Sequence, residues 1–235
     1  MSLAAARSEA AGRITELREH LSLIRRLESD DPKVPDSNDV QILRGLFYVH
    51  VYGLIEYTIN QAVVEVIRFV NGSATPYQAL IENFLSIALD PDFSALSAAG
   101  GKSRKWDRRF SFLDRQRSTD ACTPSESVLG YDLQNIWCET LELVFQCFAI
   151  SEPIVPESRY RPFIDEIVNK RNAVAHGRET ASRMGRGTRS PDLSMRLEAV
   201  IETCIYLLDR FDLYLTNLEF AKADARASIR GRLVT

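Results

Sequence analysis

Apolar residues recur three or four positions apart along most of the chain, a spacing that places them on one face of an α-helix. Residues 3–27 show the pattern first, on a stripe made of Leu3, Ala6, Ala10, Ile14, Leu17, Leu21 and Ile24. Asp30-Asp31-Pro32 follows this stripe, and proline has no N–H to continue a helical ladder. The pattern therefore predicts an amphipathic N-terminal helix over residues 3–27.

The same spacing predicts further helices, each bordered by proline, glycine or a side chain that can cap a helix end. We expect them over residues 39–70, 76–89, 133–150, 161–176 and 191–221. The bordering residues include Asp39, Asp90-Pro91, Asp132 and Gly177. Because no segment alternates with the period of two that a β-strand requires, we expect an all-α helical bundle.

We expect one domain over residues 1–235, with its core at about 39–220 and a tail at 222–235. Residues 45–55 carry no formal charge, but this stretch is too short to span a bilayer, so its helix is expected to be central and buried. Residues 97–130 have Ser, Gly, Thr and Pro at both ends. This composition indicates an insertion with one short helix near residues 106–117.

Composition excludes several classes of protein. The net charge is −3, so attraction to nucleic acid has to be local. The four cysteines include no CxxC pair, and three histidines are too few for a metal cluster, so we expect neither a metal nor another cofactor. The first residues have no apolar segment of the signal-peptide type, and we therefore expect a cytoplasmic protein with no membrane association.

The segment from Arg171 to Gly177 combines a permanent cation, an amide and an imidazole at the end of a predicted helix. Asn172 and His176 are four residues apart, so the amide can orient the imidazole. The negative end of the helix dipole favours protonated histidine, and a guanidinium suits a phosphodiester whose charge grows in the transition state. The alternative is structural: both side chains cap carbonyls or pair with Glu166 or Glu179.

The sequence R-N-A-V-A-H at 171–176 resembles the R-x4-6-H signature of the HEPN superfamily, including the polar residue after the arginine. The helix over 39–70 contains L-F-Y-V-H-V-Y-G-L-I-E, similar to the aromatic-rich helix ending in an acid that HEPN toxins have. The order of predicted elements also resembles that family, with an extra N-terminal helix and an inserted basic segment. The resemblance covers about residues 39–220 and is closest to stand-alone HEPN nucleases of bacterial toxin–antitoxin and defence systems.

This resemblance implies a metal-independent endoribonuclease that acts as a homodimer, with two signature helices sharing one RNA-binding cleft. Arg171 would hold and polarise the scissile phosphate, and His176 would act as general acid/base, leaving 2′,3′-cyclic phosphate ends. Asn172 would position either group. Glu56 carries over as the acid that orients the arginine, or else it is a carboxylate with a structural partner. A cognate antitoxin is implied as a second protein partner.

Two basic regions are candidates for RNA binding. Cations outnumber acids between residues 102 and 117, where Trp106, Phe110 and Phe112 are interleaved with cations that include Lys105, Arg108 and Arg109. Such a mixture can follow phosphates and stack on bases, unless the aromatic rings pack inward. The second region is the expected loop 181–190 and its flanks, with Arg178, Arg183, Arg186, Arg189 and Arg196. It is either a phosphate-binding segment or a solvated loop.

Two further functions stay open at this point. One is a HEPN-type module without catalysis that binds RNA, nucleotides or a protein. The other is a helical interaction protein in which residues 3–27 pair with another chain. His20 and His50 receive no catalytic role, because one lies on a charged helix and the other in an apolar run.

Overall fold

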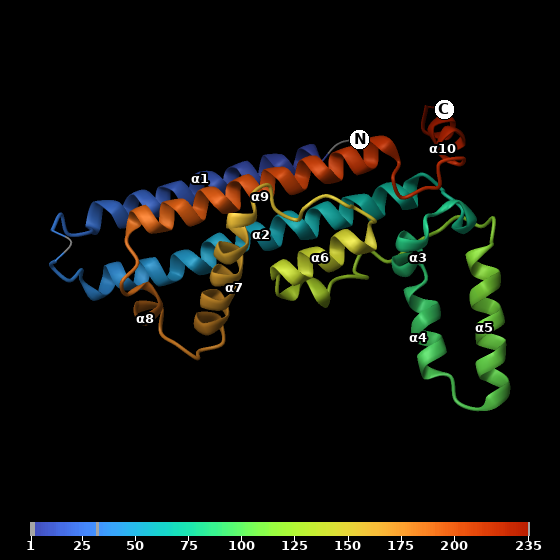
Figure 1. Cartoon of the computed structure of the whole chain (residues 1–235), viewed down its shortest axis with the longest axis horizontal. Coiled ribbons are helices and arrows are strands. Elements are labelled where there is room, and N and C mark those ends of the chain that lie inside the picture. The colour runs from blue at the N-terminus through green and yellow to red at the C-terminus, as the bar shows by residue number, and fades with distance from the viewer. Residues whose placement is uncertain (1–2, 32, 235) are drawn as a thin grey trace. The chain divides into compact units, whose positions relative to one another are not determined.

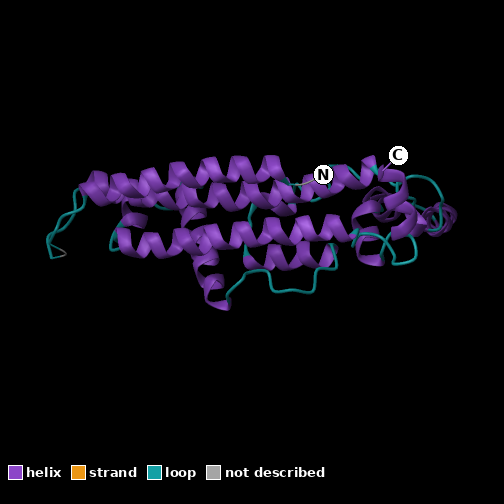
Figure 2. Cartoon of the chain, turned by 90° about the horizontal axis from the view of Figure 1, so that it is seen from above, coloured by secondary structure: helices purple, strands orange, loops and turns teal. Residues whose placement is uncertain are grey.

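The computed structural model describes residues 3–31 and 33–234 of the chain (Figure 1). Pro32, which was expected to end the first helix, lies outside these residues. The described residues form α-helices, short 3-10 turns and loops, with two isolated bridges and no β-strand (Figure 2). The all-α prediction is therefore confirmed.

The helices follow one another in the order α1 (Ala4–Leu27), α2 (Asn38–Gly72), α3 (Glu82–Ala88), α4 (Asp90–Ala98), α5 (Lys102–Gln116), α6 (Cys138–Cys147), α7 (Arg161–Ala175), α8 (Ala181–Gly185), α9 (Ser190–Asn217) and α10 (Arg226–Val234). The chain divides into two compact units. Unit 1 comprises Met1–Ala62, Leu133–Leu141 and Pro153–Asp209, and unit 2 comprises Val63–Asp132, Glu142–Glu152 and Arg210–Thr235. The single domain expected from sequence stays a prediction.

Unit 1 is built on α1 and the first parts of α2 and α9, which run side by side (Figure 1). Most of the predicted apolar stripe of α1 is buried, including Leu17 and Ile24. The Arg13 guanidinium lies 4.3 Å from the centre of the Tyr57 ring, which joins α1 to α2. Helix α7 crosses α2 steeply, and this crossing sets the position of the signature residues (Figure 1).

Unit 2 has an aromatic core in which rings meet edge to face, the arrangement that the ring quadrupole favours. The Phe148 ring lies 5.3 Å from Phe211, 5.5 Å from Tyr214 and 5.8 Å from Phe84, measured between centroids. Helices α4 and α5 lie side by side and antiparallel as a hairpin (Figure 1). Phe93 and Phe112 hold this hairpin together, with ring centroids 5.0 Å apart.

The helix predicted over 76–89 is wrong in its first half. Leu80 and Ile81 are extended, with ψ of 150° and 155°, and only α3 is α-helical in this range. The backbone here bonds to the segment after α9: Ile81 N–H donates to Phe220 O at 3.0 Å, and Lys222 N–H donates to Ala79 O at 2.8 Å. These long-range bonds replace the local helical ones. Pro91, expected to close the helix, instead opens α4.

The helix predicted over 133–150 is shorter, because a 3-10 turn at Asp132–Gln134 and a break precede α6. Asp132 was expected to cap this helix, and that expectation is wrong. The first N–H of α6, that of Cys138, donates to Asp165 Oδ1 of α7 at 2.9 Å. Helix α6 ends in a Schellman arrangement, with Ala149 at φ 55° and Ile150 N–H bonded to Phe145 O.

Smaller differences concern helix ends. Helix α9 stops at Asn217, four residues before the predicted end, because Leu218 adopts φ 53° and Glu219 N–H bonds to Tyr214 O. Helix α2 begins at Asn38, and Ser37 Oγ rather than Asp39 accepts a bond from Val40 N–H, at 3.4 Å. The expected tail contains α10. No described helix is long and apolar enough to cross a membrane.

Candidate active site

Arg171 of α7 is held against α2 by several groups. Its Nη1 donates to Asn172 Oδ1 at 2.7 Å and lies 3.4 Å from Asn135 Oδ1, while its Nη2 lies 3.9 Å from Glu56 Oε1. Its guanidinium carbon is 4.3 Å from the centre of the Tyr52 ring, a cation–π distance. The side chain keeps 20% of its surface exposed. The cation is therefore fixed in direction and still open to an anion.

Tyr52 is fixed by the backbone that precedes α6. Its hydroxyl donates to Gln134 O at 3.0 Å and accepts from Ile136 N–H at 3.2 Å. The same hydroxyl lies 3.4 Å from Glu56 Oε1. Burial raises the pKa of Tyr52, which keeps the phenol neutral. The ring beneath Arg171 therefore has little freedom to turn.

His176 is the C-cap residue of α7, with φ −90° and ψ 8°, and its side chain is exposed. Gly177 follows at φ 66°, so the predicted C′ glycine is confirmed. Among the described residues, the imidazole makes no hydrogen bond or ion pair. Asn172, which was expected to orient this imidazole, is 8% exposed and bonds to Arg171 instead. The structure thus joins Asn172 and Glu56 to Arg171, and leaves His176 open.

A second cation of α7 repeats this arrangement one turn away along α2. Lys170 Nζ lies 4.2 Å from the centre of the Tyr48 ring and donates to its hydroxyl at 2.9 Å. Lys170 also pairs with Glu166 at 3.0 Å, and Arg196 pairs with Glu166 at 2.9 Å. Burial alone would raise the pKa of Glu166, but these two cations bring it below its ordinary value. Glu166 is therefore occupied by Lys170 and Arg196. The structural alternative expected it to pair with Arg171 or His176, and it pairs with neither.

The basic segment after the signature is more ordered than expected. Residues 181–185 form α8, so the loop predicted over 181–190 is wrong for this part. Helix α8 lies against α2 at two glycines: a Cβ at Gly45 would stand 1.9 Å from Ala181 O, and one at Gly185 would stand 2.0 Å from Gln41 O. Only glycine permits so close an approach of two backbones.

The arginines of this segment have different surroundings. Arg183 pairs with Glu179 at 3.1 Å, so Glu179 too is occupied. Arg178 and Arg186 are exposed. Arg186 stands beside a cavity of about 440 Å³ that Arg44 and Arg189 also line.

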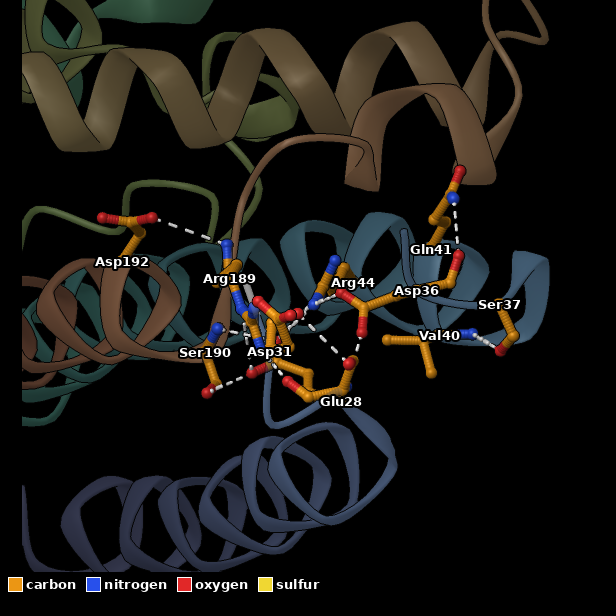
Figure 3. Close-up of polar contacts among 11 residues, drawn as sticks. Glu28, Asp31, Asp36, Ser37, Val40, Gln41, Arg44, Arg189, Ser190 and Asp192 are labelled. Atoms are coloured by element: carbon orange, nitrogen blue, oxygen red, sulfur yellow. Dashed lines mark hydrogen bonds and ion pairs between the residues drawn. The ribbon is translucent and has the colours of Figure 1, made fainter. Parts of the chain in front are cut away.

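Arg189 belongs to a buried ionic network rather than to an open loop. Its guanidinium donates to Ser29 O and lies 3.8 Å from Glu28 Oε2. Figure 3 shows Glu28 between Ser190 and Arg44, and Arg44 Nε donates to Glu28 Oε1 at 2.9 Å. Arg44 is 2% exposed and also pairs with Asp36. This network joins the end of α1 to α2 and to the start of α9.

The basic region of unit 2 lies on α5, which begins earlier than predicted. Lys105, Arg108 and Arg109 are exposed, and the Lys102 side chain lies outside the described residues. Phe112 packs toward α4, whereas Trp106 is 55% and Phe110 60% exposed. Two of the three aromatic rings therefore face solvent.

Within residues 3–31 and 33–234, no three His, Cys, Asp or Glu side chains gather as a metal site would require. None of the four cysteines forms a disulfide, and burial raises the pKa of Cys122 and Cys204 to about 12. His20 and His50 meet between α1 and α2 with their Nδ1 atoms 3.3 Å apart, away from the signature.

Sequence reasoning missed Tyr52 and Asn135, two residues whose side chains hold Arg171. Tyr52 lies four residues before Glu56, so both face the same side of α2, and this spacing could have identified the ring. Asn135 lies in an irregular segment far away in sequence. No periodic pattern marks it, and only the fold brings it to Arg171.

Comparison with known proteins identifies the family of the chain. No curated protein and no solved structure matches the chain. The model of the family described as RiboL-PSP-HEPN matches residues 8–217. This match begins inside α1, whereas the resemblance noted in the sequence began at residue 39. HEPN domains form a family that includes ribonucleases. Because the match covers most of its length, the chain belongs to the RiboL-PSP-HEPN family of the HEPN superfamily.

Proposed function

We propose that this protein is a metal-independent endoribonuclease that uses Arg171 and His176. The observation that carries the proposal is the fixed guanidinium of Arg171, which has Tyr52 beneath it and retains an exposed surface. A guanidinium preorganised in this way stabilises the charge that develops on a phosphodiester without reorganising during the reaction. Asn172 and Glu56 set its direction through their contacts with it.

In the proposed reaction, the ribose 2′-oxygen attacks the adjacent phosphorus and the 5′-oxygen of the next nucleotide leaves. His176 exchanges protons with these oxygens, for which its exposed imidazole is accessible. The bond that forms closes a 2′,3′-cyclic phosphate, and the leaving oxygen takes up a proton. Water is not consumed in this step, and Arg171 balances the added negative charge on the phosphoryl oxygens.

A homodimer is part of the proposal. Within one protomer, His176 makes no bond to Arg171 among the described residues, although they belong to one signature. A second signature helix facing the first would bring two arginines and two histidines to one RNA strand. We further propose a role as a toxin or defence effector, with an antitoxin protein as the partner that holds it in check. RNA contacts near the signature are assigned to Arg178, Arg183 and Arg186, whereas the Arg189 guanidinium is engaged by Ser29 and Glu28.

The test is cleavage of an RNA of mixed structure in EDTA by wild type, Arg171→Ala and His176→Ala. His50→Ala is the matched control, because His50 is also partly exposed in unit 1 but lies away from the signature. We expect wild type and His50→Ala to cut and to leave cyclic phosphate ends, and the two signature variants to lose activity. Equal cutting by His176→Ala would refute the assignment.

The second candidate is a HEPN module that binds RNA without cutting it. The contacts that Arg171 already makes favour this candidate, because Asn172, Asn135 and Glu56 hold the guanidinium in place. Under this function, wild type and His176→Ala bind RNA equally and neither cuts. Arg171→Ala then weakens binding without changing any product.

A further inference from the structure

Helix α5 carries an exposed apolar stripe that nothing in the described part of unit 2 covers. Trp106, Phe110 and Leu113 are 55%, 60% and 43% exposed. Their spacing of four and three residues places them on one side of the helix. The centroids of the Trp106 and Phe110 rings are 6.1 Å apart with their planes tilted by 31°, so the two rings form a continuous surface.

Two cations flank this stripe on one side. Arg109 lies over the Trp106 ring at 4.8 Å, and Lys105, four residues before Arg109, is exposed on the same side of the helix. Arg104 and Arg108 lie on the opposite side of the helix, where they line a cavity with Ala95 and Ala98 of α4, and Arg115 lies 5.7 Å from the centre of the Tyr77 ring. They add to the positive charge of the helix, against Asp107 and Asp114. The molecule as a whole has a net charge of −3, so this helix is a local positive surface on an acidic protein.

We propose that the α5 surface, meaning Trp106, Phe110 and Leu113 with Lys105 and Arg109, binds single-stranded RNA. Unpaired bases stack on exposed rings and on guanidinium planes, while the phosphates follow the neighbouring cations. The proposal rests on the proposed nuclease function. It adds a second contact surface for the substrate in unit 2, whereas the signature lies in unit 1.

Charge and shape favour RNA over the other occupants of such a surface. An anionic membrane surface prefers a helix with a broad apolar face, but only three large apolar side chains are exposed on α5. An acidic protein segment would pair with the cations, but its carboxylates do not stack on the exposed rings. Unpaired bases of any sequence do stack on such rings. Both alternatives are outcomes of the test below.

The chain offers its own reporters, because it has two tryptophans and each unit contains one. Trp137→Phe leaves only Trp106 on α5, and Trp106→Phe leaves only Trp137. Both variants are made in the full-length His176→Ala protein, so that the RNA stays intact. A short single-stranded RNA of mixed sequence is titrated into each. We expect saturable quenching of Trp106 fluorescence.

Affinity is then compared for Phe110→Ser and for Tyr131→Ser, measured with a labelled RNA. Tyr131 is the matched control, an aromatic residue of unit 2 that is 83% exposed but lies outside α5. Loss of one stacking ring should raise Kd at least about fivefold in Phe110→Ser. Tyr131→Ser should leave Kd unchanged. Lys105→Ala should lower the steepness of the salt dependence by about one contact.

Three results would overturn the proposal: an unchanged Trp106 signal with RNA, equal affinities for Phe110→Ser and wild type, or quenching only by phosphatidylglycerol vesicles or by poly-glutamate. Cleavage by the wild-type protein is measured in parallel and separates the two proposals. If wild type does not cut but RNA quenches Trp106, the nuclease function fails and the α5 surface stands. If wild type cuts and Phe110→Ser cuts with an unchanged KM, the α5 surface fails alone.

Discussion

Glu28 caps the N-terminus of α9 from the end of α1. Its Oε1 accepts from Ser190 N–H at 2.8 Å and its Oε2 accepts from Ser190 Oγ at 2.6 Å. A carboxylate at a helix N-terminus satisfies a free N–H and interacts favourably with the positive end of the helix dipole. The same carboxylate neutralises buried Arg44, so one side chain serves a helix end and a buried cation together.

We expect Glu28→Gln to lower the free energy of unfolding by about 3 kcal/mol, because Asp36 is then the one charged partner left to Arg44 in the described part of the chain. Urea denaturation measures the change. Glu19→Gln, at an exposed glutamate of the same helix, is the control and should change stability by less than about 0.5 kcal/mol. Equal stabilities for the two variants would contradict the role given to Glu28.

Tyr52 should matter for cleavage because it positions Arg171. Tyr52→Phe keeps the ring but loses the hydroxyl that binds Gln134 O and Ile136 N–H. We expect kcat for RNA cleavage to fall while KM changes little. Tyr48→Phe is the matched control: Tyr48 is equally buried and lies under Lys170. Equal kcat values for the two variants, at a temperature where both are folded, would show that the position of Arg171 does not depend on Tyr52.

His20 should make stability depend on pH. Burial, and then the nearby His50, lower the pKa of His20 below its ordinary value of 6.5. Below about pH 6.5 the unfolded chain therefore binds more protons at His20 than the folded chain does. The contribution of neutral His20 to stability is complete above about pH 6.5 and is lost as the pH falls toward the folded-state pKa. Around His20, the facing charged or titratable groups are His50 and, beyond it, Glu16.

The measurement is urea denaturation at about pH 7.5 and pH 5.5. We expect wild type to lose more stability on acidification than His20→Gln, which cannot be protonated. His176→Ala removes an exposed histidine and should keep the wild-type difference. The assignment to His20 is wrong if His20→Gln retains the full pH dependence.

The approach of α8 to α2 should tolerate no side chain at Gly45. Gly45→Ala places a Cβ on the Ala181 carbonyl, and we expect a loss of about 2 kcal/mol or more. Gly53→Ala lies on the same helix with no atom within 4 Å of the new Cβ, and it should stabilise by about 0.5–1 kcal/mol through helix propensity. Thermal unfolding of both variants tests this pair, and a harmless Gly45→Ala would refute the close packing.

Periodicity predicted the long helices well because each buries one continuous stripe, as α1 does with Leu17 and Ile24. It failed where distant backbone or side chains decide a helix end. Ile81 leaves the helical conformation because Phe220 O takes its N–H, and α6 starts at Cys138 because Asp165 caps it from α7. Nothing in the local sequence marks these partners.

In the candidate site too, local spacing predicted some features, and residues distant in sequence decided the others. The i,i+4 spacing places Glu56 on a definite side of α2, and the fold brings it to Arg171. The spacing of Asn172 and His176 was a poorer guide, because His176 leaves the helix at its cap and Asn172 is drawn to the adjacent guanidinium. Arg189 looked like an open cation in sequence, since the acid beside it, Glu28, lies 161 positions earlier.

The glycine contacts of α8 have a consequence for how an anion would be bound. A basic loop that is mobile before binding loses backbone entropy when it closes on a ligand, and this loss weakens the complex. Arg183 lies on a helix whose backbone already rests on α2 at Gly45 and Gly185. Most of that backbone entropy is already lost when the protein folds. Binding of a phosphate to Arg183 therefore restricts mainly the Arg183 side chain.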